Sequence, residues 1–140
     1  MKVMYVDCQN GISGDMLAGA FIDSGMPISH IKNLLKRIRL KSVSISIREV
    51  KRGALRAKKF DVIIPSHLKH HSGFHAHEIA HYLKRLPTPI AQKALAMFDC
   101  LIKAEKLCHG KNSPIHLHEI GAIDTIVDLT ALAAGLAYFD

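Results

Sequence analysis

Residues 116–128 constrain the fold more than any other stretch of this sequence. The run reads His-Leu-His-Glu-Ile-Gly-Ala-Ile-Asp-Thr-Ile-Val-Asp, so two imidazoles and three carboxylates are interspersed with side chains of the kind that fill protein cores. If residues 116–118 are extended, both histidines point to one side and Leu117 points to the other. Charged side chains are seldom buried among apolar residues unless they are paired. The run therefore predicts an extended segment that leads through Gly121 into a helix, with its polar side chains gathered in one place.

Two aspartates add oxygen donors to this pair of histidines. Asp124 and Asp128 are four residues apart on the predicted helix, so their side chains share one face. Two imidazoles with one or two carboxylates form a ligand set that suits zinc, iron, nickel or manganese, without choosing among them. The alternative is structural, a hydrogen-bonded histidine pair beside a helix whose first turn is favoured by Asp124. We expect a divalent metal site at this run.

Length and composition fit one globular domain. The chain has 140 residues, and 49% of them are hydrophobic, which is enough for a core. No window reaches the roughly 20 uninterrupted apolar residues that a membrane helix needs. The sequence reaches an acid at Asp7, too early for the apolar core of a secretory signal, so a cytoplasmic protein is expected. Three cysteines without a CxxC pair predict neither a disulfide framework nor a cysteine zinc site.

The net charge of +7 does not by itself indicate a nucleic-acid partner. The basic residues gather along a predicted amphipathic helix and its end, residues 32–41, and around a predicted hairpin, residues 51–59, without interleaved aromatic side chains. They are either solvated faces or a field that attracts a phosphorylated small molecule. We expect neither a nucleic-acid nor a membrane partner.

The patterns predict an α+β fold, with a small mixed sheet of about three strands packed against about five helices. Residues 2–7 are an apolar run that suits a buried first strand. Alternation over residues 43–48, with a partner at residues 60–64 across Arg52-Gly53, predicts a hairpin. The predicted helices run from Ser13 to near Gly25, around residues 31–38, over residues 76–86 and 89–108, and from about residue 123 onward.

The turn at residues 11–15, Gly-Ile-Ser-Gly-Asp, is a second candidate site between the first predicted strand and helix. Its backbone amides and the helix N-terminus suit a phosphate or another anion, which makes three residues candidates for cofactor binding: Gly11, Ser13 and Gly14. The turn matches neither a Walker loop nor a dinucleotide fingerprint. Asp7 and Asp15 would repel an anion unless a cation bridges them. The pattern therefore favours a phosphate bound through a metal ion over a phosphate bound directly. A merely structural turn is the alternative.

The chain is rich in histidine, with ten in all, and six of them fall between residues 67 and 81. Such a density is typical of metal ligands or of a solvated, pH-responsive loop. Within it, residues 77–81 spell H-E-x-x-H, which on a helix would aim both imidazoles at one zinc ion with Glu78 as general base. A histidine-rich segment produces this short pattern by accident more readily than an average one. A zinc metalloprotease is therefore the less favoured alternative.

Several short runs, taken in order and spacing, resemble the N-terminal part of the nickel-insertion proteins (LarC). They are Asp7-Cys8 with residues 11–16, His70-His71, Ala104-Glu105 with His109-Gly110, and residues 116–124 with Asp128. The resemblance spans essentially the whole chain, and its last run is far more specific than H-E-x-x-H. Leu117 replaces an aromatic residue expected between the two histidines, and residues 75–81 follow no family pattern.

The resemblance implies a nickel chelatase of the lyase class. Such a protein loads nickel into pyridinium-3,5-bisthiocarboxylic acid mononucleotide, maturing the cofactor of lactate racemase, and uses CTP with a divalent cation such as Mg²⁺ or Mn²⁺. Family members are longer. Residues 1–140 are thus expected to be one N-terminal domain, with the family's C-terminal region, where the resemblance places the nucleotide site, outside this sequence.

The resemblance and the residue pattern together assign roles to individual side chains. His116 and His118 are expected to bind nickel, with four further ligands or supporting groups: Glu119, Asp124, His70 and His71. Asp7 and Asp15 are expected to hold a cation or to orient the substrate. A C-terminal polypeptide or another copy of the chain would complete the site. The alternative from another class is a nickel-binding module without turnover.

Overall fold

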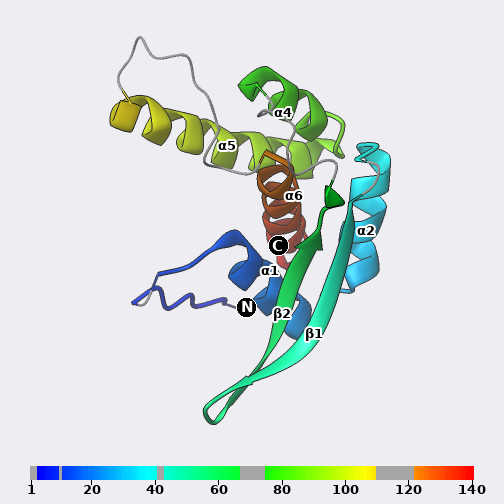
Figure 1. The fold of residues 1–140 in the computed structure, drawn as a ribbon, viewed down its shortest axis with the longest axis vertical. Helices are drawn as coiled ribbons and strands as arrows, with labels where there is room; N and C mark the ends of the chain where they lie inside the picture. The colour runs from blue at the N-terminus through cyan, green and yellow to red at the C-terminus, as the bar shows by residue number, and fades with distance from the viewer. Residues whose placement is uncertain (1–2, 10, 41–42, 67–74, 110–121) are drawn as a thin grey trace.

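The computed structural model describes residues 3–9, 11–40, 43–66, 75–109 and 122–140 (Figure 1). The elements in chain order are α1 (Gly14–Asp23), α2 (Ile28–Arg37), β1 (Ser44–Arg52), β2 (Leu55–Ile63), α4 (Ala76–Leu83), α5 (Thr88–His109) and α6 (Ala122–Phe139). The predicted α+β class and its five helices are confirmed within these ranges. The sheet of the described residues has two strands instead of about three.

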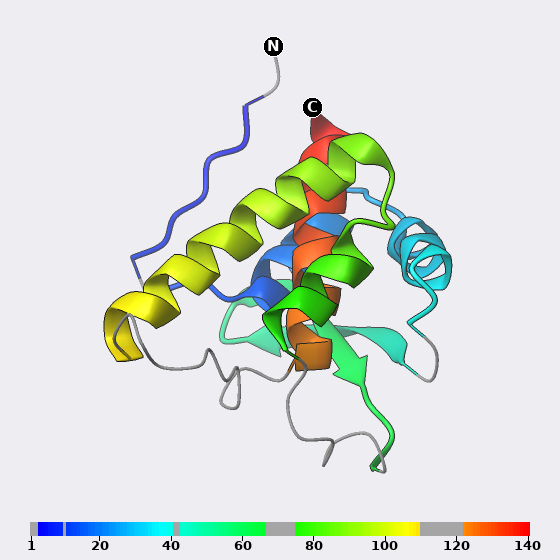
Figure 2. The same cartoon turned by 90° about the horizontal axis from the view of Figure 1, so that it is seen from above.

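The missing strand is the predicted first one, and this prediction was wrong for the structure at hand. Residues 3–7 belong to no strand, and the side chains of Val3 and Tyr5 are 77% and 87% exposed. Figure 2 shows the N-terminal segment running beside the helices with no strand next to it. A strand needs a neighbour for its N–H and C=O groups, and β1 and β2 pair with each other.

The predicted hairpin is confirmed. β1 and β2 are antiparallel, with Arg52 paired to Leu55 across a turn in which Gly53 has φ +59°, a conformation that glycine adopts without strain. Phe60 of β2 is buried against the core. Helix α1 lies on this strand, and Gly19 sits so close to the backbone carbonyl of Lys58 that no side chain would fit between them. The hairpin is thus anchored to the helices through α1.

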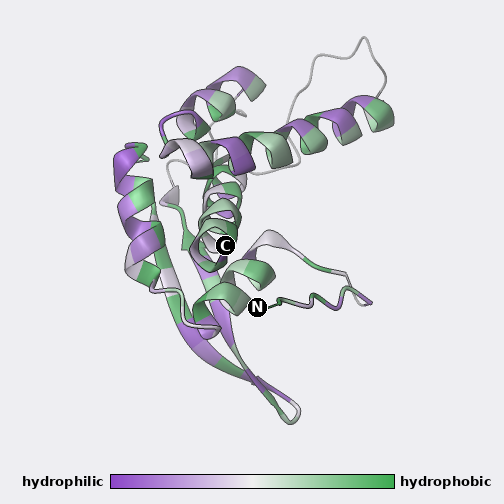
Figure 3. Cartoon of the chain, turned by 180° about the vertical axis from the view of Figure 1, so that it is seen from behind, coloured by the Kyte–Doolittle hydropathy of each residue, from purple (hydrophilic) through white to green (hydrophobic). Residues whose placement is uncertain are grey.

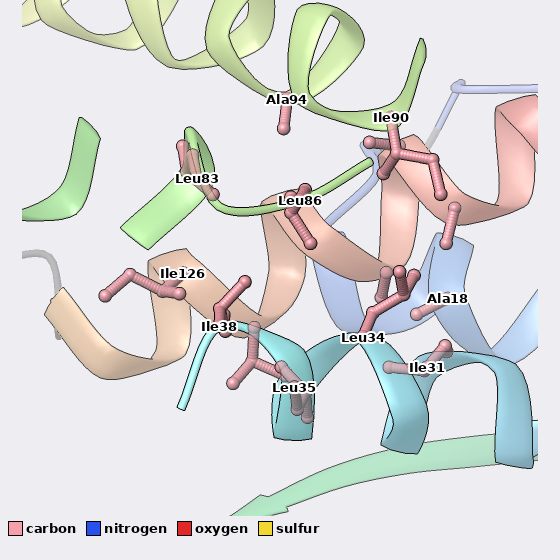
Figure 4. Packing of buried hydrophobic residues seen from close by; sticks show 14 of the residues in the cluster. Ala18, Ile31, Leu34, Leu35, Ile38, Leu83, Leu86, Ile90, Ala94 and Ile126 are labelled. Atoms are coloured by element: carbon pink, nitrogen blue, oxygen red, sulfur yellow. The ribbon is translucent and has the colours of Figure 1, made fainter. Parts of the chain in front are cut away.

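Helix α6 is the centre of the core. It contacts α1, α2, α4 and α5, and its residues Ile126, Val127, Ala131, Ala133 and Ala134 are fully buried. Figure 4 shows Ile126 of α6 in the same buried cluster as Leu83 of α4 and Ile38, which follows α2. In Figure 3, α2 and α5 carry alternating hydrophilic and hydrophobic bands, as expected for helices with one face in the core. No helix within the described ranges is long and apolar enough to span a membrane.

Helix α4 ends three residues before its predicted end. The segment after Leu83 tightens, because the amide of Leu86 donates to the carbonyl of Leu83, a three-residue step. Pro87 disfavours helical backbone at the residue before it, which explains the early end. Helix α5 then begins at Thr88, with Pro89 at its second position.

Small residues let α1 and α6 approach closely. A Cβ built on Gly135 of α6 would lie 2.5 Å from Cγ of Phe21 on α1, so an aromatic ring occupies the space of the absent side chain. A Cβ built on Gly14 would lie 2.6 Å from Cγ of Asp128. The two contacts are seven residues apart on each helix, which is about two turns. The helices therefore run parallel, and both begin at the same end of the molecule.

Replacing Gly135 by alanine is expected to lower the free energy of unfolding by about 1–3 kcal/mol, because the added methyl group overlaps the buried Phe21 ring. This loss outweighs the gain of roughly 1 kcal/mol that alanine brings to helix propensity. Urea denaturation measures the change. Phe21→Leu, alone and combined with Gly135→Ala, supplies the control: the double variant should lose less stability than the two single losses added. Additive losses would contradict this contact.

Candidate functional site

Three carboxylates gather where α1 and α6 begin. Asp128, on the second turn of α6, fills the space that a side chain at Gly14 would take. The negative charges of Asp15 and Asp124 both act on Asp128. Two stretches that the sequence analysis treated separately, the turn at residues 11–15 and the run at residues 116–128, therefore meet through their described parts.

The pKa of Asp128 records this crowding. Burial and, after it, repulsion by Asp15 and Asp124 together raise the pKa of its carboxyl from 3.8 to about 6. The side chain is half-buried, so little water is available to stabilise its charge. A divalent cation among these oxygens would favour the ionised form, and carboxylates are ligands that such ions prefer. The arrangement suits a cation better than an anion.

The first turn of α1 fixes the orientation of Asp15. The hydroxyl of Ser13 donates to Asp15 Oδ1, and the amide of Met16 donates to the same oxygen at 2.9 Å. Ser13 occupies the predicted N-cap position, although its side chain bonds to Asp15 and not to a backbone amide of the helix. Just before the helix, the amide of Gly11 donates to the carbonyl of Cys8 at 2.9 Å, with φ +80° at Gly11. The turn is thus built locally and holds the Asp15 carboxylate, whose charge acts on Asp128 of α6.

Asp7 lies in different surroundings. Its Oδ1 accepts the amide of Gln9 at 3.1 Å, and the residue lines a cavity of about 300 Å³ between the N-terminal segment and α1. Gly11 lines the same cavity, whose other walls are mostly apolar and include Met4 and Met16. Asp15 is not among its lining residues. A joint role of Asp7 and Asp15 stays a prediction.

Most of the predicted metal ligands lie outside the described residues, namely His70, His71, His116, His118 and Glu119. Their ligation, and the extended form predicted for residues 116–118, therefore stay predictions. Within the described ranges, no group of three or more His, Cys, Asp or Glu side chains could hold a metal ion. The aspartates at the starts of α1 and α6 consequently need donors from elsewhere to complete a metal site.

Sequence reasoning did not foresee the contact between Gly14 and Asp128. It paired Asp128 only with Asp124, because helical spacing reveals neighbours on one helix and not on another. The available signal was Gly14, a residue that lowers helix stability where it begins α1. Only the packing of α6 explains why a side chain is excluded there.

The H-E-x-x-H segment forms a different kind of surface. His77 and His81 line a cavity of about 430 Å³ on α4 together with Lys84 and Arg85. Oε2 of Glu78 accepts the backbone amide of His75 at 2.7 Å, so this carboxylate caps the start of the helix. The cationic side chains beside the histidines disfavour a bound metal ion. The local structure therefore does not favour a zinc protease.

Asp128→Asn is expected to stabilise the protein near neutral pH and to lose that advantage in acid. Because the folded-state pKa of Asp128 lies above 3.8, the stability of the wild type falls as pH rises from about 4 to about 6, while the amide variant escapes this penalty. The expected gain at pH 7.5 is about 1–2 kcal/mol, allowing for solvent screening of a half-buried group.

Urea denaturation of both proteins at pH 4 and pH 7.5 measures this difference. Asp99→Asn, at an exposed position on α5, controls for the same chemical change. A gain of equal size at both pH values would show that Asp128 is not disfavoured as an anion in the folded protein.

Comparison with known proteins indicates the family of this chain. Residues 4–140 match the family described as nickel insertion protein. A protein of Geobacillus kaustophilus (strain HTA426), named pyridinium-3,5-bisthiocarboxylic acid mononucleotide nickel insertion protein, is 38% identical over 97% of this chain and 36% of its own length. A protein of the same name from Thermotoga sp. (strain RQ2) is 35% identical over 97% of this chain and 37% of its own length. No solved structure matches significantly.

The chain thus spans about a third of the length of these curated relatives. The family match nevertheless spans the turn before α1, the histidine pair at residues 116–118 and the aspartates of α6. The resemblance stated from short runs is therefore confirmed over nearly every residue, and the chain belongs to the nickel insertion protein family.

Proposed function

We propose that this chain is the metal-binding part of a nickel insertion protein that delivers nickel to pyridinium-3,5-bisthiocarboxylic acid mononucleotide. The observation that carries the proposal is the meeting of Asp15, Asp124 and Asp128 at the starts of α1 and α6. Family membership supports nickel as the metal, and the relatives' names supply the substrate. The three aspartates mark the position at which the metal is proposed to bind.

Chain connectivity allows the histidines to reach these carboxylates. His118 precedes Ala122, the first residue of α6, by four residues, and four residues span at most about 14 Å. Glu119 is one residue nearer. Imidazole nitrogens from His116 and His118, added to the carboxylate oxygens, would make a mixed donor set that suits Ni²⁺. His70 and His71 are proposed as further ligands or as groups that orient the ligands.

Nickel is the cargo of this reaction, so its binding must be reversible. Imidazole and carboxylate hold Ni²⁺ moderately, whereas the substrate offers sulfur and carbon donors that hold it more strongly. The metal can therefore pass downhill from protein to substrate. In this scheme the side chains of residues 116–128 present the ion and take no part in covalent chemistry.

The turn before α1 is proposed to receive the substrate. Backbone amides at the start of a helix suit a phosphate group, which makes Gly11, Ser13 and Gly14 the proposed contacts. Asp15 is proposed to hold a bridging cation or to orient the substrate, and Asp7 is proposed to share this role. Hard carboxylate oxygens fit a Mg²⁺ or Mn²⁺ ion at this end of the fold.

We assign CTP to the part of the relatives that this chain does not match. We infer that Asp7 and Asp15 alone offer too few donors to enclose a nucleoside triphosphate. The mature cofactor would then serve lactate racemase. A nickel-binding module without turnover is the second candidate function. It is favoured by one fact, which is that the chain spans only about a third of the relatives' length.

Calorimetric titration with Ni²⁺ is expected to show about one equivalent bound, with affinity falling below about pH 6.5 because protonated histidine does not ligate metals. The double variant His116→Ala/His118→Ala should lose this binding.

The matched control is His77→Ala/His81→Ala, which removes the two histidines of the H-E-x-x-H segment on α4. It should bind nickel like the wild type. If the control loses binding while the first variant keeps it, the metal site belongs to α4 and the present assignment is wrong.

Activity of the isolated chain separates the two candidate functions. With excess substrate, CTP and Mg²⁺, the chain alone is expected to bind nickel but to load no substrate over multiple turnovers. Adding the unmatched part of the Geobacillus relative as a separate polypeptide should restore transfer, and Asp15→Asn should then reduce it without changing the helix content seen by circular dichroism. Repeated turnover by the chain alone would refute this division of labour.

A further inference from the structure

Residues 3–7 are apolar enough for a buried strand, but their side chains are exposed. Met4, Tyr5 and Val6 all line the cavity against α1. Met4 and Val6 are 46% and 42% exposed, whereas Val3 and Tyr5 are 77% and 87% exposed. Side chains of an extended chain alternate between two faces, so Met4 and Val6 share the less exposed face and Val3 and Tyr5 share the more exposed one. A strand made for the surface carries polar side chains on its outer face. Both faces here are apolar, which is typical of a strand covered on both sides.

The backbone of this segment also lacks main-chain partners, although the Cys8 thiol donates to the carbonyl of Val6 at 3.9 Å. Within the described part of the chain, no N–H or C=O group of residues 3–7 bonds to another main-chain group. The hairpin strands pair only with each other, and Figures 1 and 2 show the segment without a neighbouring strand. An extended segment with free N–H and C=O groups is a template for adding a strand.

We propose that residues 3–7 form a β-strand of a sheet that is completed by an apolar strand from the part of the family's length that this chain does not match. The main-chain groups of residues 3–7 would supply hydrogen bonds, and Val3 and Tyr5 would be covered by that part of the protein. The proposal rests on family membership and is independent of nickel binding.

Two observations identify this occupant. The curated relatives are nearly three times as long as the matched region, since it makes up 36% and 37% of their lengths. The apolar surface also continues past residues 3–7 to the end of α6. The Phe139 ring stacks on Phe21 with centroids 6.0 Å apart, and Phe21 lines the same cavity as Met4 and Val6.

The end of α6 therefore adds to the surface that needs covering. Its last residues include three exposed apolar side chains: Leu136, Tyr138 and Phe139. One covering body that extends from the free edge of residues 3–7 to the end of α6 would remove both sets from water. Polypeptide of the family's own unmatched length fits this requirement.

Hydrogen exchange tests the proposal without nickel. The 140-residue chain is mixed with the unmatched part of the Geobacillus kaustophilus relative, and amide exchange is followed in both samples. Residues 3–7 are expected to exchange freely in the chain alone and to slow by about tenfold or more in the mixture, because β pairing protects their amides. Amides of the β1–β2 hairpin should change little.

Three outcomes would overturn the proposal. The first is that the two polypeptides do not associate, and the second is a complex in which residues 3–7 still exchange freely. The third is protection already present in the chain alone together with a dimer in analytical ultracentrifugation, which would assign the edge to a second copy.

Two variants sharpen the test. Tyr5→Asp should weaken the complex by on the order of tenfold or more, because it would bury a carboxylate on the covered face. Leu107→Asp, at a side chain that is 82% exposed on α5, makes the same kind of change elsewhere and should bind like the wild type. Both replace exposed side chains, and circular dichroism checks their folding. Equal affinity of the two variants for the partner would contradict the assigned face.

Discussion

The close parallel packing of α1 on α6 is the contact on which the rest of this structure depends. One glycine on each helix makes it possible, with Gly14 admitting Asp128 and Gly135 admitting the Phe21 ring. Because both helices begin at the same end, their positive dipole ends lie near the clustered carboxylates. These dipoles offset part of the repulsion among the three acids. The offset is incomplete, because the pKa of Asp128 stays raised to about 6. The packing of α1 on α6 thus links the core to the candidate site.

Local elements of the fold could be read from the sequence, whereas the first strand could not. Alternating apolar and polar residues on both sides of Arg52-Gly53 predict the hairpin. The spacing of apolar residues predicts the helices, and Pro87 marks the break between two of them. Both signals describe contacts between residues close in sequence. Residues 2–7 carry an equally clear apolar pattern, yet a strand exists only with a partner, and none lies beside residues 3–7 among the described residues. The apolar composition of residues 2–7 indicated that they need to be buried, but it could not show which strand would pair with them.

The candidate site was foreseen in two halves. Spacing placed Asp124 and Asp128 on one helix face, and the turn at residues 11–15 stood out by its glycines and its acid. Nothing in the spacing joins residues separated by more than a hundred positions. The packing of α6 on α1 joins them, and the raised pKa of Asp128 follows from that packing. Family membership was the one long-range property that short motifs did reveal, because their order along the chain carries information that a single motif lacks.

The two glycine contacts also fix the number of residues between them on α1 and on α6. They lie seven residues apart on each helix, so they remain aligned only while both intervals keep the same length. One residue inserted into α6 between Asp128 and Gly135 would rotate the remainder of that helix by about 100°. The carboxylate would still face Gly14, but the notch for Phe21 would turn away from it. In this chain, substitutions of side chains along either helix should therefore disturb the packing less than a change in the number of residues between these contacts.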